Sequence, residues 1–166
     1  MATSRTGKDA CDLLDADHKA VRKMFKEYEA LTQSRARSAA QKKLELARRI
    51  CLELAVHAQL EEEIFYPALR HAIKDTSLLD EAQVEHQALR DLMEQLQAMV
   101  SPDEMFDAKV KVLGEFTDHH VKEERTDLFP KARAARKLDL VAMREELEER
   151  KETLLAEHAE MGEMAA

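Results

Sequence analysis

The chain has 166 residues, a length that fits one domain with a sizeable core. Its three glycines and three prolines, together with 45% hydrophobic and 36% charged residues, favour long helices and leave little material for the turns of a β-sheet. The net charge of −8 argues against a nucleic-acid-binding surface, and the sequence contains no apolar run of about 18 residues that would indicate a membrane span.

The first predicted helix runs from residue 9 to about residue 33, after a polar stretch of residues 1–8 that we expect to be flexible. Apolar residues recur along this helix at the spacing of an amphipathic helix, and His18 lies on the same stripe. We therefore expect the imidazole of His18 to face the core.

A second helix is predicted to follow a polar connection and to reach about residue 71. Its apolar face includes His57 and Glu61, which are four residues apart and therefore point the same way. Pro67 lacks a backbone N–H and interrupts the hydrogen-bond ladder about one turn after the carboxylate. We expect the helix to kink or bend there.

A third helix is predicted to begin at Thr76 or Ser77, either of which can cap it, and to end near residue 100. His86 lies on its apolar stripe.

The fourth helix is expected to begin at the sequence SPDE, with Ser101 as the N-cap and Glu104 closing a capping box. It carries His120 and Glu124 inward. Gly114 in its middle is unfavourable for a helix by about 1 kcal/mol, which indicates close packing or room for something small.

Two segments of the chain are near copies of each other: HAQLEEEIFYP starts at His57 and HVKEERTDLFP starts at His120. Shorter similar pieces surround His18 and His86, so the chain is interpreted as two duplicated helical hairpins. A four-helix bundle formed by two such hairpins would bring six side chains from four helices to one place. These are His18, His57, Glu61, His86, His120 and Glu124.

We predict an all-α fold in which residues 9–136 form an up-down four-helix bundle. Residues 137–166 are predicted to form an additional C-terminal helix, which has no counterpart in either hairpin. This helix could cover the bundle or a neighbouring subunit, so a homodimer stays open.

The six side chains suit a metal site. Buried Glu61 and Glu124 would each cost several kcal/mol if left ionised and unpaired, and a pair of divalent cations removes that problem. Four imidazoles and two carboxylates suit iron, manganese or zinc, whereas the lack of inward thiolates argues against structural zinc or an iron–sulfur cluster. With two carboxylates for two metals, the economical arrangement gives each metal two histidines and lets both metals share Glu61 and Glu124.

Other side chains near the predicted site are given ordinary roles. His71 and His158 lie off the stripes or outside the repeat, and His119 points about 100° away from its neighbour His120. Four aromatic residues are expected to pack in the core, with the walls of a dry pocket as the alternative. They are Phe25, Phe65, Tyr66 and Phe116.

The motifs resemble the hemerythrin-like (HHE) cation-binding family, a four-helix bundle with a non-haem di-iron centre. The resemblance covers about residues 10 to 135 and rests on H-x3-E-E-E-x-F-Y-P from His57, H-V-x-x-E at His120, the early DxxHKAV-type histidine and the E-H pair at His86. It implies an oxo- or hydroxo-bridged centre of two iron ions, with Glu61 and Glu124 as bridges. His18 and His57 would bind one iron, and His86 and His120 the other.

One departure from the oxygen-carrying hemerythrins affects the expected function. Those proteins have a fifth histidine one turn before the residue matching His86, where this chain has Ala82. Both irons would then have an exchangeable position, unless one is filled by another side chain. The candidates are Gln83, Glu85, Asp17 and His119.

Open positions on both irons favour redox turnover or sensing over reversible oxygen transport. The leading hypothesis is a protein that binds O2, peroxide or nitric oxide in oxidative or nitrosative stress. The alternatives are a catalase-like, peroxide-decomposing enzyme, and iron storage or oxygen carriage. Two cysteines and the lack of a signal-peptide core at the start favour a cytoplasmic location.

Overall fold

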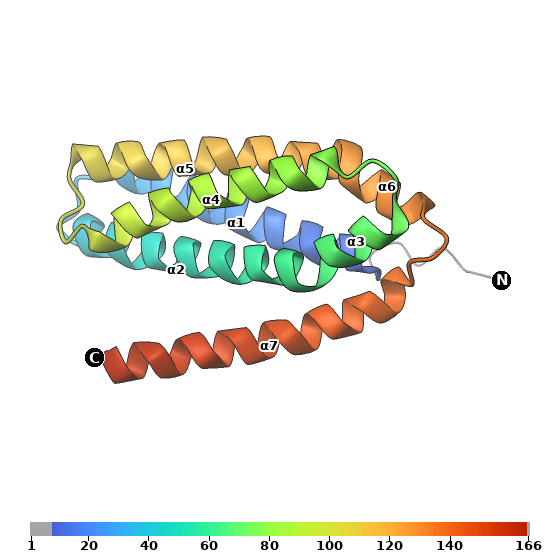
Figure 1. Cartoon of the computed structure of the whole chain (residues 1–166). Helices are drawn as coiled ribbons and strands as arrows, with labels where there is room; N and C mark the ends of the chain where they lie inside the picture. The colour runs from blue at the N-terminus through green and yellow to red at the C-terminus, as the bar shows by residue number, and fades with distance from the viewer. Residues whose placement is uncertain (1–7, 166) are drawn as a thin grey trace.

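Four long helices run up and down beside one another and are joined at alternate ends (Figure 1). The computed structural model describes residues 8–165, so residues 1–7 of the predicted flexible start lie outside the described residues. The predicted all-α, up-down four-helix bundle is confirmed. Its long helices are α1 (Ala10–Thr32), α2 (Ala39–Leu60), α4 (Ser77–Ala98) and α5 (Glu104–Glu123).

The core of the bundle consists of two apolar clusters, one on either side of a polar layer. Along α1, Leu14 belongs to one cluster and Val21 to the other, with His18 between them. The same alternation occurs on α4, where Ala82 and Leu89 flank His86. The chain also changes cluster between Leu54 and Leu60, around His57, and between Leu113 and Leu128, around His120. The histidines of all four helices therefore lie at one level of the bundle.

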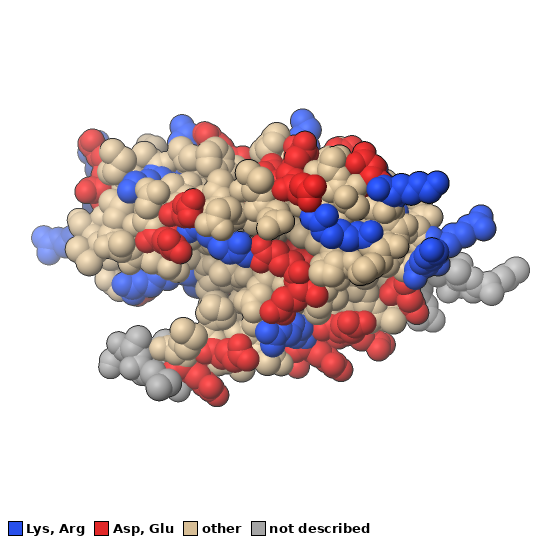
Figure 2. All heavy atoms as spheres, viewed as in Figure 1, with Lys and Arg blue, Asp and Glu red and all other residues tan. Residues whose placement is uncertain are grey.

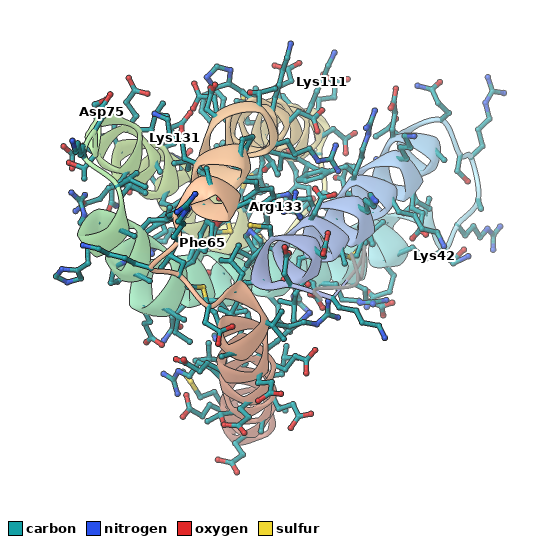
Figure 3. The ribbon with its side chains drawn as sticks, turned by 90° about the vertical axis from the view of Figure 1, so that its right-hand side faces the viewer. Lys42, Phe65, Asp75, Lys111, Lys131 and Arg133 are labelled. Carbon is teal, nitrogen blue, oxygen red and sulfur yellow. The ribbon has the colours of Figure 1, made fainter. Side chains whose placement is uncertain are left out.

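The helix α7 (Leu140–Ala165) stands outside the four long helices, as the view along the bundle shows (Figure 3). It lies against α1 and α2, and it buries Met143, Leu147 and Leu154 in the apolar cluster at that end. In this structure the final helix therefore covers its own bundle, while a homodimer stays a prediction. Among the described residues, no helix combines the length and the apolar character needed to cross a membrane.

The predicted interruption near Pro67 takes the form of a π-helical turn and not of a simple kink. The turn η1 (Glu61–Phe65) precedes α3 (Tyr66–Ala72), and the equivalent η2 (Glu124–Leu128) precedes α6 (Phe129–Ala134). In each turn the carbonyl of the glutamate accepts a hydrogen bond from the backbone N–H five residues later. The wider turn accommodates a proline at the second position of the following helix, where an unbroken α-helix would suffer a clash with the preceding turn.

The cap of α5 differs from the prediction. The N-cap is Asp103 and not Ser101, and its carboxylate accepts a hydrogen bond from the backbone N–H of Phe106 at 3.0 Å. Aspartate caps a helix as well as serine does, and this register begins the helix at Glu104, so that Glu104 closes no capping box. Of the two alternatives predicted for Gly114, the structure shows close packing, because a Cβ atom there would lie 3.2 Å from Cδ1 of Phe25.

Candidate metal centre

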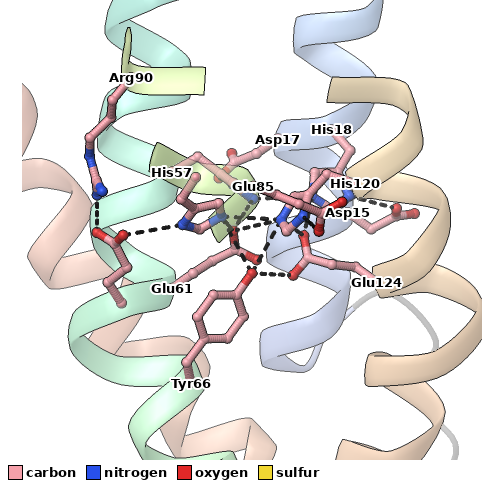
Figure 4. Close-up of polar contacts among 12 residues, drawn as sticks. Asp15, Asp17, His18, His57, Glu61, Tyr66, Glu85, Arg90, His120 and Glu124 are labelled. Carbon is pink, nitrogen blue, oxygen red and sulfur yellow. Dashed lines mark hydrogen bonds and ion pairs between the residues drawn. The ribbon is translucent and has the colours of Figure 1, made fainter. Parts of the chain in front are cut away.

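The six side chains singled out in the sequence all lie buried in the polar layer between the two apolar clusters. Figure 4 shows how His18, His57, Glu61, His120 and Glu124 gather there. Glu61 and Glu124 are completely inaccessible to solvent. Each histidine comes from a different long helix, and each glutamate is the first residue of a π-helical turn. The structure thus brings the six together, and their role as metal ligands stays a prediction.

The inner ring nitrogens and the two carboxylates divide into two groups that share a glutamate. One group contains His18, His57, Glu61 and Glu124, and the other contains Glu61, His86 and His120; the ligand atoms of each group lie within 4.8 Å of one another. A carboxylate oxygen of each glutamate lies close to the Nε2 atom of one histidine in each group. The distances are 3.1 Å for His18–Glu124, 3.2 Å for His57–Glu61, 3.3 Å for His86–Glu61 and 3.3 Å for His120–Glu124.

The outer ring nitrogen of every one of these histidines faces another carboxylate. A neutral imidazole that donates from Nδ1 to a carboxylate presents the lone pair of Nε2 on its other side, which fixes the tautomer and the direction of the ring. The Nδ1 pairs are His18–Asp15 at 3.4 Å, His57–Asp17 at 3.1 Å, His86–Glu62 at 3.3 Å and His120–Glu85 at 3.0 Å.

Without bound protons or metal ions, the interior of the site would be short of positive charge. Three buried carboxylate oxygens, both of Glu61 and Oε1 of Glu124, have no hydrogen-bond partner among the described residues, because the nearby ring nitrogens are close but poorly aligned. The Nε2 atoms of His18 and His57 are only 3.1 Å apart, and so are those of His86 and His120. Lone pairs and anions converge on the same two places. This donor set fits two metal cations.

Protons neutralise the site in the metal-free protein. Burial lowers the pKa of His57, but the neighbouring Glu61 and Asp17 carboxylates outweigh it and raise this pKa to about 10. Burial likewise opposes the charge on His120, whose pKa the Glu124 carboxylate raises to about 12. Burial acts to raise the pKa of Glu61, but the positive charge of the neighbouring His57 holds it well below its usual value. Metal entry must therefore displace protons.

Tyr66 contributes a polar group that the sequence reasoning missed. Its buried hydroxyl donates to Oε2 of Glu124 at 3.2 Å and lies 3.2 Å from Nε2 of His120 and 3.4 Å from Nε2 of His86. The matching residue of the second copy is Phe129, whose ring stacks on that of His18. This tyrosine-for-phenylalanine difference between two otherwise similar motifs was the available signal.

The residues considered as additional ligands do not join the six. Asp17 and Glu85 bind the outer nitrogens of His57 and His120, and the Gln83 side chain is exposed. His119 is 66% exposed and pairs with Glu85 and with Glu123. Phe116 is 46% exposed and belongs to neither apolar cluster, so it does not pack in the core as expected.

Residues 9–132 match the family model of the Hemerythrin HHE cation binding domain. The chain belongs to this family. Its structure is similar to the crystal structure of a Hemerythrin HHE cation binding domain-containing protein, the Rv2633c homolog from Mycobacterium kansasii. The TM-score is 0.71 at 22% sequence identity, over 88% of this chain and 86% of that one, a likeness that concerns the fold.

A curated relative from Nostoc sp. is named DNA nickase. It is 32% identical over 120 residues, which make up 71% of this chain and 32% of that protein. The chain therefore spans about a third of the length of this relative.

Proposed function

We propose that this protein binds two iron ions inside its helical bundle and uses them to bind O2, peroxide or nitric oxide in a response to oxidative or nitrosative stress. The observation that carries the proposal is the set of three orphaned buried carboxylate oxygens, surrounded by four imidazoles whose outer nitrogens already have partners. His18 and His57 would hold one ion, His86 and His120 the other, and Glu61 and Glu124 would bridge them. When bound, a di-iron pair supplies one-electron redox chemistry and exchangeable coordination positions.

Cavities approach the buried site from two sides and suit a small ligand. One has a volume of about 340 Å³, lies between α1 and α5, and includes His18, Phe25 and Thr117 in its lining. The other has a volume of about 440 Å³ and is lined by residues that include Glu62 and Tyr66. Because one cavity reaches His18 and the other reaches Tyr66, both lie next to the site, which supports exchange of small molecules over permanent storage.

The chain provides a proton donor at one end of the site. Burial, followed by the negative charges of Glu124 and Glu61, raises the pKa of Tyr66 well above its usual value, so the phenol is protonated in the metal-free protein. Its hydroxyl can hold an oxygen-containing ligand beside His86 and His120. Ala82, buried and without a ligand atom, leaves this end free of a further protein ligand among the described residues, which favours turnover or sensing over oxygen carriage.

Metal analysis of the purified and the iron-reconstituted protein tests the proposal. We expect two irons per chain and a near-ultraviolet absorption band in the oxidised form. A protein that takes up zinc only, or no metal, would overturn the proposal. Steady evolution of oxygen after addition of peroxide would identify a catalase-like enzyme, and an oxygenated spectrum that reverses on degassing would identify a carrier.

DNA nicking, the activity in the name of the curated relative, is not favoured for this chain. The net charge is −8. On the face of the molecule drawn in Figure 2, lysines and arginines are interspersed with acidic side chains. Binding to DNA depends on neutralising phosphates with clustered basic side chains. Supercoiled plasmid incubated with the metal-loaded protein should stay supercoiled. Conversion of the plasmid to the nicked form would show that this protein nicks DNA.

A further inference from the structure

Each histidine-facing carboxylate of the site is itself contacted by a basic side chain. Three of these basic side chains, Arg125, Arg90 and His119, belong to the four-helix bundle. The fourth, Lys151, comes from α7, which begins after the part of the chain that matches the family model. The pairs are Asp15–Arg125 at 2.5 Å, Glu62–Arg90, Glu85–His119 at 3.5 Å and Asp17–Lys151 at 2.6 Å.

The carboxylate that depends on α7 is the most deeply buried of the four. The side chain of Asp17 is 10% exposed, whereas those of Asp15, Glu62 and Glu85 are between 23% and 29% exposed. A buried carboxylate needs an opposite charge more than a half-exposed one does, because water solvates it less. Within the bundle, Asp17 contacts His57 through Oδ2, and its Oδ1 accepts from Lys151.

The position of Lys151 is fixed by the packing of α7. Leu147 and Leu154, four residues before it and three after it, lie fully buried against α1 and α2, so Lys151 projects from the same face of α7 toward the bundle. The apolar contacts therefore hold the lysine against Asp17. Arg150, next to it on α7, reaches a different residue and pairs with Glu63 at 2.8 Å.

We propose that Lys151 is a positioning residue of the metal centre: it fixes Asp17, which orients the ring of His57, and so couples the docking of α7 to metal binding by the group of His18 and His57. This inference rests on the proposed di-metal function. Partners of metal-bound histidines in the outer layer of a site typically change metal affinity by about 10–100-fold when removed. Because coupling free energies are reciprocal, a metal in this group also tightens the docking of α7 on the bundle.

The test compares Lys151→Met with Arg150→Met in the full-length chain. Both variants remove one ion pair between α7 and the bundle, but the described partners of Glu63 are Arg150 and Gln59, neither of which belongs to the site. Titration of the metal-free protein with ferrous iron under anaerobic conditions, in competition with a chelator, measures the two affinities. Lys151→Met leaves Asp17 in place and removes only its anchor, so it should weaken one of the two sites by about tenfold, the lower end of the range for losing a histidine partner. Arg150→Met should weaken neither metal site. Lys151→Arg keeps a positive charge beside Asp17 and should bind iron with the affinity of the wild type.

Two outcomes of the titration would overturn the inference: equal affinities in Lys151→Met and Arg150→Met, or an equal loss at both sites. Hydrogen exchange of α7 adds the reciprocal readout, with metal-dependent protection expected in the wild type and lost in Lys151→Met. Fewer than two irons per wild-type chain would defeat the proposed function alone. In that event the Nδ1–H resonance of His57 in the metal-free protein decides the inference: it must shift in Lys151→Met and stay in place in Arg150→Met.

Discussion

Raising the pH should destabilise the metal-free protein and leave the metal-loaded protein almost unchanged. The reason is the proton on His57, whose pKa is about 10 in the folded chain against 6.5 as the ordinary value. A group whose pKa is raised by folding stabilises the fold fully below the lower value and loses this contribution as the pH rises toward the higher one. The loss therefore falls between about pH 6.5 and about pH 10. A bound metal replaces the proton and removes this dependence.

The size of the effect follows from the number of protons. One additional proton bound by the folded state changes the free energy of unfolding by at most about 1.4 kcal/mol per pH unit. From about pH 7 to about pH 9, His57 alone should remove about 2–3 kcal/mol, and His120, with its raised pKa, acts in the same direction. A domain of this size loses about 2–4 °C in Tm per kcal/mol, so the expected decrease is about 4–12 °C.

Thermal unfolding followed by circular dichroism measures this decrease in chelator-treated and in iron-loaded protein. The variant His71→Gln, which removes an exposed histidine of α3, is the matched control and should keep the full pH dependence. The reasoning fails if both forms lose Tm in parallel, or if the metal-free form is equally stable at both pH values.

Three further predictions test other parts of the structure. Leu147→Ala removes a fully buried side chain of α7 and should cost about 2–5 kcal/mol in chemical denaturation; a cost below about 1 kcal/mol would mean that α7 is not docked as described. Tyr66→Phe should keep both irons and weaken azide binding about tenfold through the loss of one hydrogen bond, so iron loss here would assign Tyr66 a different role. His57→Ala should lose iron while His158→Ala keeps it, and equal iron contents would defeat the ligand assignment.

The arrangement of the long helices could be predicted from the sequence because helical periodicity alone places residues three and four apart on one face. His18 and His86 sit on apolar stripes, and the pairs at His57 and His120 repeat the same spacing. Each of the four helices has a histidine on its buried face. Only one lengthwise alignment of the antiparallel helices brings all four histidines to the same level. Fold class and the convergence of the six side chains follow from this.

The position of α7 could not be predicted in the same way. Its charged residues form many i,i+4 pairs on all sides, so the pattern specifies a helix without specifying which face docks or on what. The contact of Lys151 with Asp17 depends on the register between segments 134 residues apart in the chain. Local spacing contains no information about such a contact.

Tyr66 shows why the site is more asymmetric than the duplicated motifs suggested. On an unbroken α-helix, five residues advance a side chain by about 500°, which would turn Tyr66 roughly 140° away from Glu61. The π-helical turn η1 closes with a hydrogen bond from the N–H of Tyr66 to the carbonyl of Glu61. Because this turn is wider than an α-helical turn, it brings Tyr66 back over Glu61. The same turn in the second copy brings Phe129 over Glu124 and onto the ring of His18. One end of the site thus receives a hydroxyl and the other an apolar ring, so the two metals would differ in the ligands that they accept.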